Sequence, residues 1–280
     1  MSATEDIAAT GGADMPLIRV ENLVKRLGDR TVCEDLTFDV SARSITVVLG
    51  LSGEGKSTLL RILSGTMKPD AGRVLVHGKD ITDLSPEDLR DWQKRFGMLF
   101  QGAALFHSMT VGENVALPIL EHTDLDKTVV ALMVKLKLEM VGLWGFEEFR
   151  PGQLSGGMQK RVALARAIAL DPEVILCDEP TSGLDPVVAG VIVKLITDLR
   201  EKLRITAVVV THDLAHAFKM ADQVVMLYQG RMVASGTPDD LRSHPDPVLQ
   251  QFLKGSPEGP IAMRRSGEDF LADLLKQEGR

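Results

Sequence analysis

The sequence lacks a long apolar run and any excess of positive charge. No stretch reaches the roughly 18–20 apolar residues that a membrane-spanning helix requires. The longest candidate, residues 129–144, is interrupted by Lys135, Lys137 and Glu139. The formal net charge is −7 and the pI is near 5.4, whereas domains that bind nucleic acid are usually basic. We therefore expect neither a spanning helix nor a nucleic-acid partner.

Cysteine is also scarce, and a targeting signal is missing. Cys33 and Cys177 lie in apolar, strand-like stretches, which predicts buried, reduced thiols in a cytosolic protein. Residues 1–16 are polar and contain no apolar core of the kind found in signal peptides, so we expect a disordered segment there. The 280 residues show no internal repeat and suffice for one large α/β domain or two small ones.

One stretch contains the phosphate-binding pattern G-x-x-x-x-G-K-[ST] at every required position. An apolar β-branched run, residues 45–49, precedes it, and apolar residues at helical spacing follow it. Backbone N–H groups in such a loop converge on a phosphate, and the helix dipole adds to the attraction. We expect Lys56 to reach the terminal phosphates and the Ser57 hydroxyl to ligate Mg²⁺. The stretch predicts binding of a nucleoside triphosphate by Gly50, Leu51, Ser52, Gly53, Glu54, Gly55, Lys56, Ser57 and Thr58.

A pair of acids ends the apolar run at residues 174–177. Adjacent carboxylates at the end of a buried strand indicate a cation nearby, and the phosphate-binding loop upstream strengthens this interpretation. We expect Asp178 to hold Mg²⁺ through water and Glu179 to polarise the attacking water.

A second helix start suited to an anion follows Leu154. Ser155 is placed to cap the helix, and Gly156 and Gly157 come directly after it. This Leu-Ser-Gly-Gly stretch resembles the signature motif of ATP-binding-cassette (ABC) ATPases. The resemblance implies that Ser155, Gly156 and Gly157 reach across a homodimer to the γ-phosphate of ATP held by the partner's loop.

Further positions resemble the same family in the order in which its motifs occur. Gln101 resembles the Q-loop glutamine, which touches Mg²⁺ and reports on the membrane partner. Asp185 resembles the D-loop aspartate at the dimer interface, and His212 the switch histidine that contacts the γ-phosphate. The resemblance covers about residues 17–252. One departure is Leu27, where the family commonly has an aromatic residue that stacks on adenine; the stem of Arg26 is a candidate replacement.

The expected fold is therefore α/β: a P-loop NTPase with a RecA-like parallel core sheet, an antiparallel β-subdomain and an inserted α-helical subdomain. The ABC ATPase domain spans residues 17–254, with the helical subdomain at about 102–170 and a C-terminal tail at 255–280. In the helical subdomain, Thr110 is expected to cap one helix. Leu132, Leu136 and Met140 mark one face of another.

Three stretches resemble the ATPase subunit of Mla-type phospholipid transporters: residues 98–106 with 114–116 and 121–123, residues 154–161 with Met158, and residues 244–247 with 251–255 and 259–260. This implies an ATPase homodimer on the cytoplasmic face of the bacterial inner membrane. The implied partners are a permease, a STAS-domain subunit and a periplasmic lipid-binding protein of the mammalian-cell-entry type. A transporter for another solute and a soluble nucleotide-dependent clamp are the alternatives.

Two apolar stretches suggest partner contacts. Residues 103–106 form either a groove for a permease helix, which we favour, or part of the core of the helical insertion. In the tail, four apolar residues share one helix face, which we expect to dock on the neighbouring ATPase subunit or the STAS-like partner. These residues are Phe270, Leu271, Leu274 and Leu275.

Overall fold

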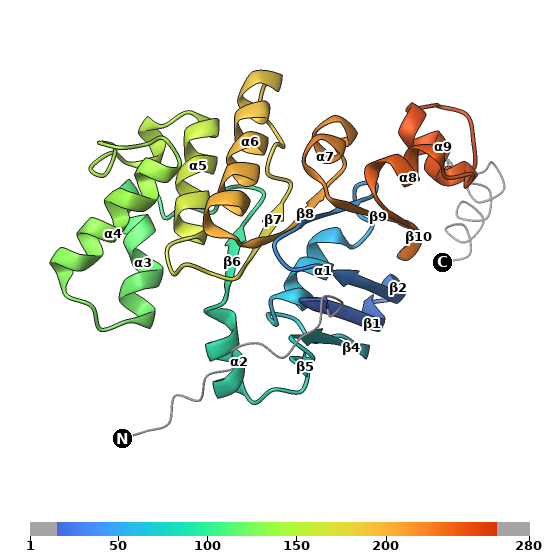
Figure 1. Ribbon diagram of the computed structural model, residues 1–280, viewed down its shortest axis with the longest axis horizontal. Helices are drawn as coiled ribbons and strands as arrows, with labels where there is room; N and C mark the ends of the chain where they lie inside the picture. The colour runs from blue at the N-terminus through green and yellow to red at the C-terminus, as the bar shows by residue number, and fades with distance from the viewer. Residues whose placement is uncertain (1–15, 262–280) are drawn as a thin grey trace, which may run out of the picture.

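The computed structural model describes residues 16–261 (Figure 1). Most of the segment predicted to be disordered, residues 1–16, lies outside the described residues. So does the predicted apolar stripe of the tail, at Phe270, Leu271, Leu274 and Leu275.

Two sheets build the molecule. The larger consists of β3 (Ile45–Leu49), β6 (Phe96–Leu99), β7 (Val174–Asp178), β8 (Thr206–Thr211), β9 (Gln223–Tyr228) and β10 (Arg231–Gly236). Its order is β10-β9-β3-β8-β7-β6, and all neighbours pair in parallel except β9 and β10. The smaller, antiparallel sheet has the order β2-β1-β4-β5. Its strands are β1 (Ile18–Leu27), β2 (Arg30–Val40), β4 (Ala71–Val76) and β5 (Lys79–Asp80). The predicted parallel core sheet with an antiparallel subdomain is confirmed.

Helices cover both faces of the larger sheet, α1 (Lys56–Leu63) on one face and α5 (Gly156–Ala167) and α6 (Pro186–Leu203) on the other. The other helices are α2 (Pro86–Gln93), α3 (Val111–His122), α4 (Lys127–Met140), α7 (Leu214–Met220), α8 (Pro238–Ser243) and α9 (Pro247–Lys254). The insertion helices α3, α4 and α5 lie at one end of the molecule, and α8 and α9 lie at the other (Figure 1). None of the helices within residues 16–261 has the length and apolar character needed to cross a bilayer.

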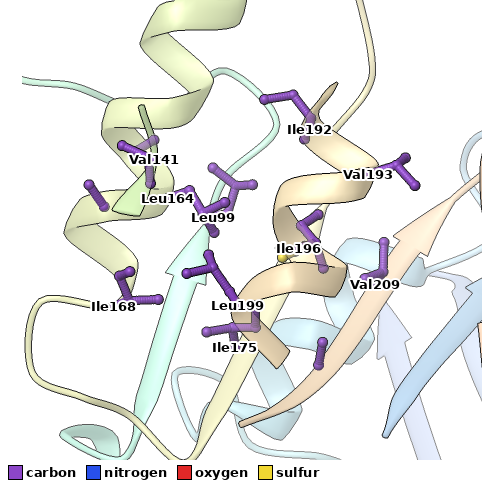
Figure 2. Packing of buried hydrophobic residues seen from close by; sticks show 14 of the residues in the cluster. Leu99, Val141, Leu164, Ile168, Ile175, Ile192, Val193, Ile196, Leu199 and Val209 are labelled. Atoms are coloured by element: carbon purple, nitrogen blue, oxygen red, sulfur yellow. The ribbon is translucent and has the colours of Figure 1, made fainter. Parts of the chain in front are cut away.

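Alternate residues of the central strands enter two different cores. On β8, Ala207 and Val209 pack into a cluster with α5 and α6, whereas Val208 and Val210 pack into a cluster with α1 and the smaller sheet. Strands buried on both faces are expected in a parallel sheet, and explain why β8 is continuously apolar. Figure 2 shows the first cluster, in which Ile196 of α6 and Leu164 of α5 lie over the sheet.

The predicted helix caps at Ser155 and Thr110 are confirmed. Ser155 precedes α5 and accepts a hydrogen bond from the Met158 N–H, and Ser85 caps α2 in the same way through the Asp88 N–H. Thr110 begins α3 with a reciprocal capping box to Glu113. A polar cap satisfies N–H groups that have no partner within the helix and contributes about 1 kcal/mol.

The buried face of α4 differs from the face marked in the sequence. Leu132 and Leu136 are 60% and 50% exposed, and of the marked residues only Met140 packs against the core. The buried apolar residues of this helix are Val130, Val134 and Leu138. Because α4 carries apolar residues on several sides, periodicity alone does not determine which side faces the core.

The stretch 103–106 is divided between core and surface. Ala103 and Leu105 are buried in the larger cluster, and Phe106 is 50% exposed. The core interpretation is confirmed for Ala103 and Leu105, and the groove for a permease helix stays a prediction.

Candidate functional site

A cavity of about 490 Å³ lies where the loops following β3, β6, β7 and β8 meet. These four strands are neighbours and run in parallel, so their carboxyl ends share one edge of the sheet. Nine of the predicted residues line the cavity: Ser52, Gly53, Gly55, Lys56, Ser57, Thr58, Gln101, Glu179 and His212. The structure therefore brings together four motifs that are far apart in the sequence.

The phosphate-binding loop folds as the pattern predicts, between β3 and α1. Gly55, just before α1, has a φ of +84°, in the left-handed region that glycine tolerates. A Cβ atom there would lie 2.3 Å from the carbonyl oxygen of Val32. The loop is thus packed directly against β2, and only glycine fits at this position.

Lys56 is held inside the loop. Its Nζ donates to the carbonyl oxygens of Gly50 and Leu51 at 2.7 and 2.9 Å, and lies 3.7 Å from Oε1 of Glu179. The residue is 6% exposed, so its side chain packs within the loop as well as placing a charge there. Burial lowers the pKa of Lys56, and the carboxylates of Glu179 and Asp178 act in the opposite direction. The ammonium is therefore held within the loop, beside the carboxylate of Glu179.

Ser57 and Asp178 provide oxygen ligands suited to Mg²⁺. The Ser57 hydroxyl donates to Oδ1 of Asp178 at 3.0 Å, and Gln101 lines the same cavity. A hydroxyl and a carboxylate are hard oxygen donors, and Mg²⁺ keeps several waters beside few protein ligands. Burial raises the pKa of Asp178, with the Ser57 hydrogen bond opposing it; a bound cation would favour the charged carboxylate. The residues present fit a magnesium site.

Glu179 is fixed by groups at the end of β8. Its Oε2 accepts from the Thr211 hydroxyl at 3.1 Å, and its Oε1 lies 2.9 Å from Nδ1 of His212. The backbone of Glu179 is left-handed, with a φ of +46°, and the residue is 8% exposed. The carboxylate is thus held at the wall of the cavity, where it can orient a water molecule.

Some predicted loop residues have other surroundings. The buried carboxylate of Glu54 accepts from the Gly230 N–H at 3.2 Å and so joins the loop to the turn before β10. At Gly50 a Cβ atom would lie 2.8 Å from the Leu227 carbonyl oxygen. Leu51 contributes the carbonyl oxygen that Lys56 binds. The side chain of Glu54 therefore anchors the phosphate-binding loop to the turn before β10.

The predicted signature residues lie outside this cavity in the single chain. Ser155 caps α5 by accepting from the Met158 N–H at 3.3 Å. Asp185 caps α6 by accepting from the N–H groups of Val187 and Val188, both at 3.0 Å. Gly156 has open space where a Cβ atom would be, with its nearest neighbour at 3.7 Å, whereas a Cβ atom at Gly157 would lie 2.3 Å from Cγ1 of Val188. Packing explains the glycine at 157 but not the one at 156.

Leu27, Arg30 and Val32 line the side of the cavity nearest the smaller sheet. Arg26, the candidate replacement for an aromatic residue, is not among the residues that line the cavity, and its backbone N–H donates to Oδ2 of Asp70 at 2.6 Å. The sequence analysis missed Arg30, Val32 and Thr211. Thr211 could have been found from the sequence, because its hydroxyl lies beside His212 at the end of a strand. Arg30 and Val32 could not, because they reach the cavity only through packing of the two sheets.

Comparisons with known proteins agree with this geometry. A family model described as "ABC transporter" matches residues 33–182, more than half of the chain. The intermembrane phospholipid transport system ATP-binding protein MlaF of Haemophilus influenzae is 42% identical over 93% of this chain and 98% of its own. The probable ribonucleotide transport ATP-binding protein mkl of Mycobacterium leprae is 41% identical over 94% of this chain and 77% of its own. Among solved structures, the dimeric, post-hydrolysis state of the ATP-binding cassette MJ0796 with ADP and Pi has a TM-score of 0.73 at 30% identity, covering 79% of this chain and 98% of that one.

Proposed function

This chain belongs to the ABC transporter family, and we propose that it is the ATP-hydrolysing subunit of a transporter that moves phospholipid between the inner and outer membranes through a separate permease. The observation that carries the ATPase assignment is the convergence of Lys56, Ser57, Glu179 and His212 on one cavity. Each of these side chains has the chemistry that phosphoryl transfer to water requires.

The roles of the residues follow from their positions. The loop N–H groups and Lys56 would bind the β- and γ-phosphates, and Ser57, Asp178 and Gln101 would hold Mg²⁺. The metal, when bound, would neutralise charge that develops on the phosphates. Glu179 orients the attacking water, and His212 holds the Glu179 carboxylate and would contact the γ-phosphate.

We propose that two copies of the chain complete each site. Ser155 and Gly156 lie at the start of α5 but outside the cavity of their own chain. Gly156 has no steric reason to be glycine, which fits a close approach by a nucleotide held in the partner. Asp185 lies near the same surface, at the start of α6. The MJ0796 cassette, similar in fold, forms a dimer.

The phospholipid substrate is supported by a relative that this chain covers almost completely. The chain spans 98% of the Haemophilus influenzae MlaF protein. It spans 77% of the Mycobacterium leprae mkl protein, and for that reason a ribonucleotide or another solute is the second candidate for the transported substrate. The complex would include a permease, a STAS-domain subunit and a periplasmic lipid-binding protein, with this chain on the cytoplasmic face of the inner membrane.

A contact with the permease is proposed beside Gln101. Phe100 and Phe106, on either side of the Gln101 loop, are 43% and 50% exposed. Large exposed apolar side chains near a loop that lines the nucleotide cavity suit a membrane partner that responds to the nucleotide.

Co-purification of the full chain with its membrane complex, followed by reconstitution into lipid vesicles, tests the proposal. We expect phospholipid in the extracted complex and ATP-dependent transfer of fluorescent phospholipid between vesicle populations. A complex carrying Glu179→Gln should bind ATP but transfer no lipid. ATP hydrolysis stimulated by a nucleotide solute, without lipid transfer, would favour the second candidate. A wild-type complex that does not hydrolyse ATP would contradict the ATPase assignment itself.

A further inference from the structure

Lys160, in the second turn of α5, carries a buried charge that the proposed mechanism does not use. The residue is 5% exposed, and its Nζ donates to backbone carbonyl oxygens in two separate loops. One belongs to Gln101, and the other, at 3.2 Å, belongs to Glu179. Placing an ammonium group in the interior is costly unless it is well hydrogen-bonded, so these contacts indicate a specific role.

The two carbonyl groups lie just beyond the end of a strand pair. Strands β6 and β7 pair in parallel up to Leu99 and Cys177, the last pair in register. Gln101 and Glu179 each follow two residues later. Beyond this last pair, the hydrogen bonds of the sheet no longer hold the two segments together. The Lys160 ammonium group connects them there, because it donates to the carbonyl oxygens of both Gln101 and Glu179.

The side chains of the bridged residues meet in the nucleotide cavity. Gln101 and Glu179 both line it, and the Glu179 backbone is left-handed, which is unfavourable for a residue other than glycine. The Glu179 carbonyl oxygen also accepts from the Ser182 N–H at 3.2 Å. Lys160 thus holds, from behind, the backbones of two residues whose side chains must converge on one ligand.

A second cation of α5 holds the rest of the same loop. Arg166 donates to the carbonyl oxygens of Ala103 and Ala104, both at 2.8 Å. Ala103 and Ala104 have φ values of +61° and +50°, so the loop takes a backbone conformation that needs support from its surroundings. The loop after Gln101 is therefore fastened to α5 at more than one point.

We propose that Lys160 is a positioning residue for ATP hydrolysis: it sets the distance between Gln101 and Glu179 so that the metal ligand and the water-orienting carboxylate act on the same phosphate. The inference rests on the proposed ATPase function. Lys160 lies one helical turn after Gly156, so a displacement of the start of α5 would move both residues together.

The test compares Lys160→Met, which keeps the length of the side chain but removes its donors, with Lys160→Arg, which keeps them. We expect Lys160→Met to lower kcat of the full chain by at least about tenfold while KM for ATP changes little, because misplacement by about 1 Å can cost 10²-fold in rate. Lys160→Arg should restore kcat to near the wild-type value.

A matched control is available in the helical insertion. Lys137 of α4 is similarly buried, at 6% exposed, but it pairs with Asp171 and does not line the nucleotide cavity. Lys137→Met should lower the melting temperature without changing kcat of the folded fraction. If Lys160→Met is poorly folded, Lys160→Gln, whose amide can donate to one carbonyl, should fold and show an intermediate kcat.

Several results would overturn the inference. These are a kcat for Lys160→Met within twofold of wild type, an equal loss of kcat per folded molecule in Lys137→Met, and no recovery of kcat in Lys160→Arg. Each presupposes an active wild-type chain, so each is distinct from failure of the ATPase assignment.

Discussion

Nδ1 of His212 lies 2.9 Å from Oε1 of Glu179, although the two residues are 33 positions apart in the chain. The His212 side chain is 54% exposed and the Glu179 side chain 10% exposed. A solvent-facing imidazole is therefore anchored on a nearly buried carboxylate. The pair joins the ends of β7 and β8 at the edge of the nucleotide cavity.

Substitution of Glu179 by Gln should separate ATP binding from hydrolysis. The amide keeps the size of the side chain and can still bond to Thr211 and His212, but it cannot accept a proton from water. We expect hydrolysis to slow by at least about 10²-fold, with ATP binding retained. Size-exclusion chromatography with ATP should show more dimer than for the wild type. If ATP leaves the mutant monomeric, the proposed contact of the signature residues across a dimer is wrong.

Lys56→Ala should abolish ATP binding or turnover. Lys56 directs its charge into the phosphate loop, and such electrostatic stabilisation is worth roughly 10²–10³ in rate. Because Lys56 also donates to the carbonyl groups of Gly50 and Leu51, we further expect a stability loss of about 1–3 kcal/mol. Nucleotide titration and thermal melts measure the two effects. Substantial ATPase activity in the purified mutant complex would contradict the assignment of Lys56.

The two glycines of the signature stretch should respond differently to Ala. Gly157→Ala places a methyl group 2.3 Å from Val188, and overpacking of this kind costs about 1–3 kcal/mol. A second substitution, Val188→Ala, should recover part of that loss. Gly156→Ala has room for the methyl group and should leave stability unchanged, yet lower ATPase activity about tenfold or more if a partner's nucleotide approaches there. Full activity in Gly156→Ala would contradict the close approach.

Asn114 should contribute strongly to the stability of the helical subdomain. It is fully buried, its amide donates to the carbonyl oxygens of Phe106 and Thr110, and its side-chain oxygen accepts from the Phe106 N–H. Asn114→Ala removes these three hydrogen bonds and leaves the Phe106 N–H without its acceptor, whereas the two carbonyl oxygens keep backbone N–H donors. We therefore expect a loss of about 2–3 kcal/mol in urea unfolding. Thr110→Ala, which removes only the cap of the same helix, should cost about 1 kcal/mol. Equal losses in the two variants would contradict this account.

The two thiols should be unreactive in the folded protein. Burial raises the pKa of Cys33 to about 11 and that of Cys177 to about 12, and the thiolate is the reactive species. At pH 8 we expect a thiol reagent to modify neither cysteine in the native protein. After denaturation, both of the chain's two cysteines should be modified. Modification of either cysteine in native protein at the rate of a free thiol would show that its site opens to solvent.

The sequence by itself determined the features that depend on adjacent residues. Residues 50–58 form a phosphate loop because glycines, Lys56 and Ser57 follow a buried strand and begin a helix. Asp178 was identified because it ends an apolar strand, and His212 because its place in the order of motifs resembles that of the family's switch histidine. Carboxyl ends of parallel strands share one edge of the sheet, which predicts that such residues lie together. The caps of α2, α3 and α5 likewise need only neighbouring residues.

Only the tertiary structure decided the contacts between distant segments. It placed β8 between β3 and β7, which brings His212 onto Glu179, and it buried Lys160 against the backbones of two loops. It also selected Val134 rather than Leu132 as a core residue of α4. The physical reason is that hydrophobic periodicity specifies that a face will be buried, whereas the shape and polarity of the neighbouring segments decide which face, and against which partner.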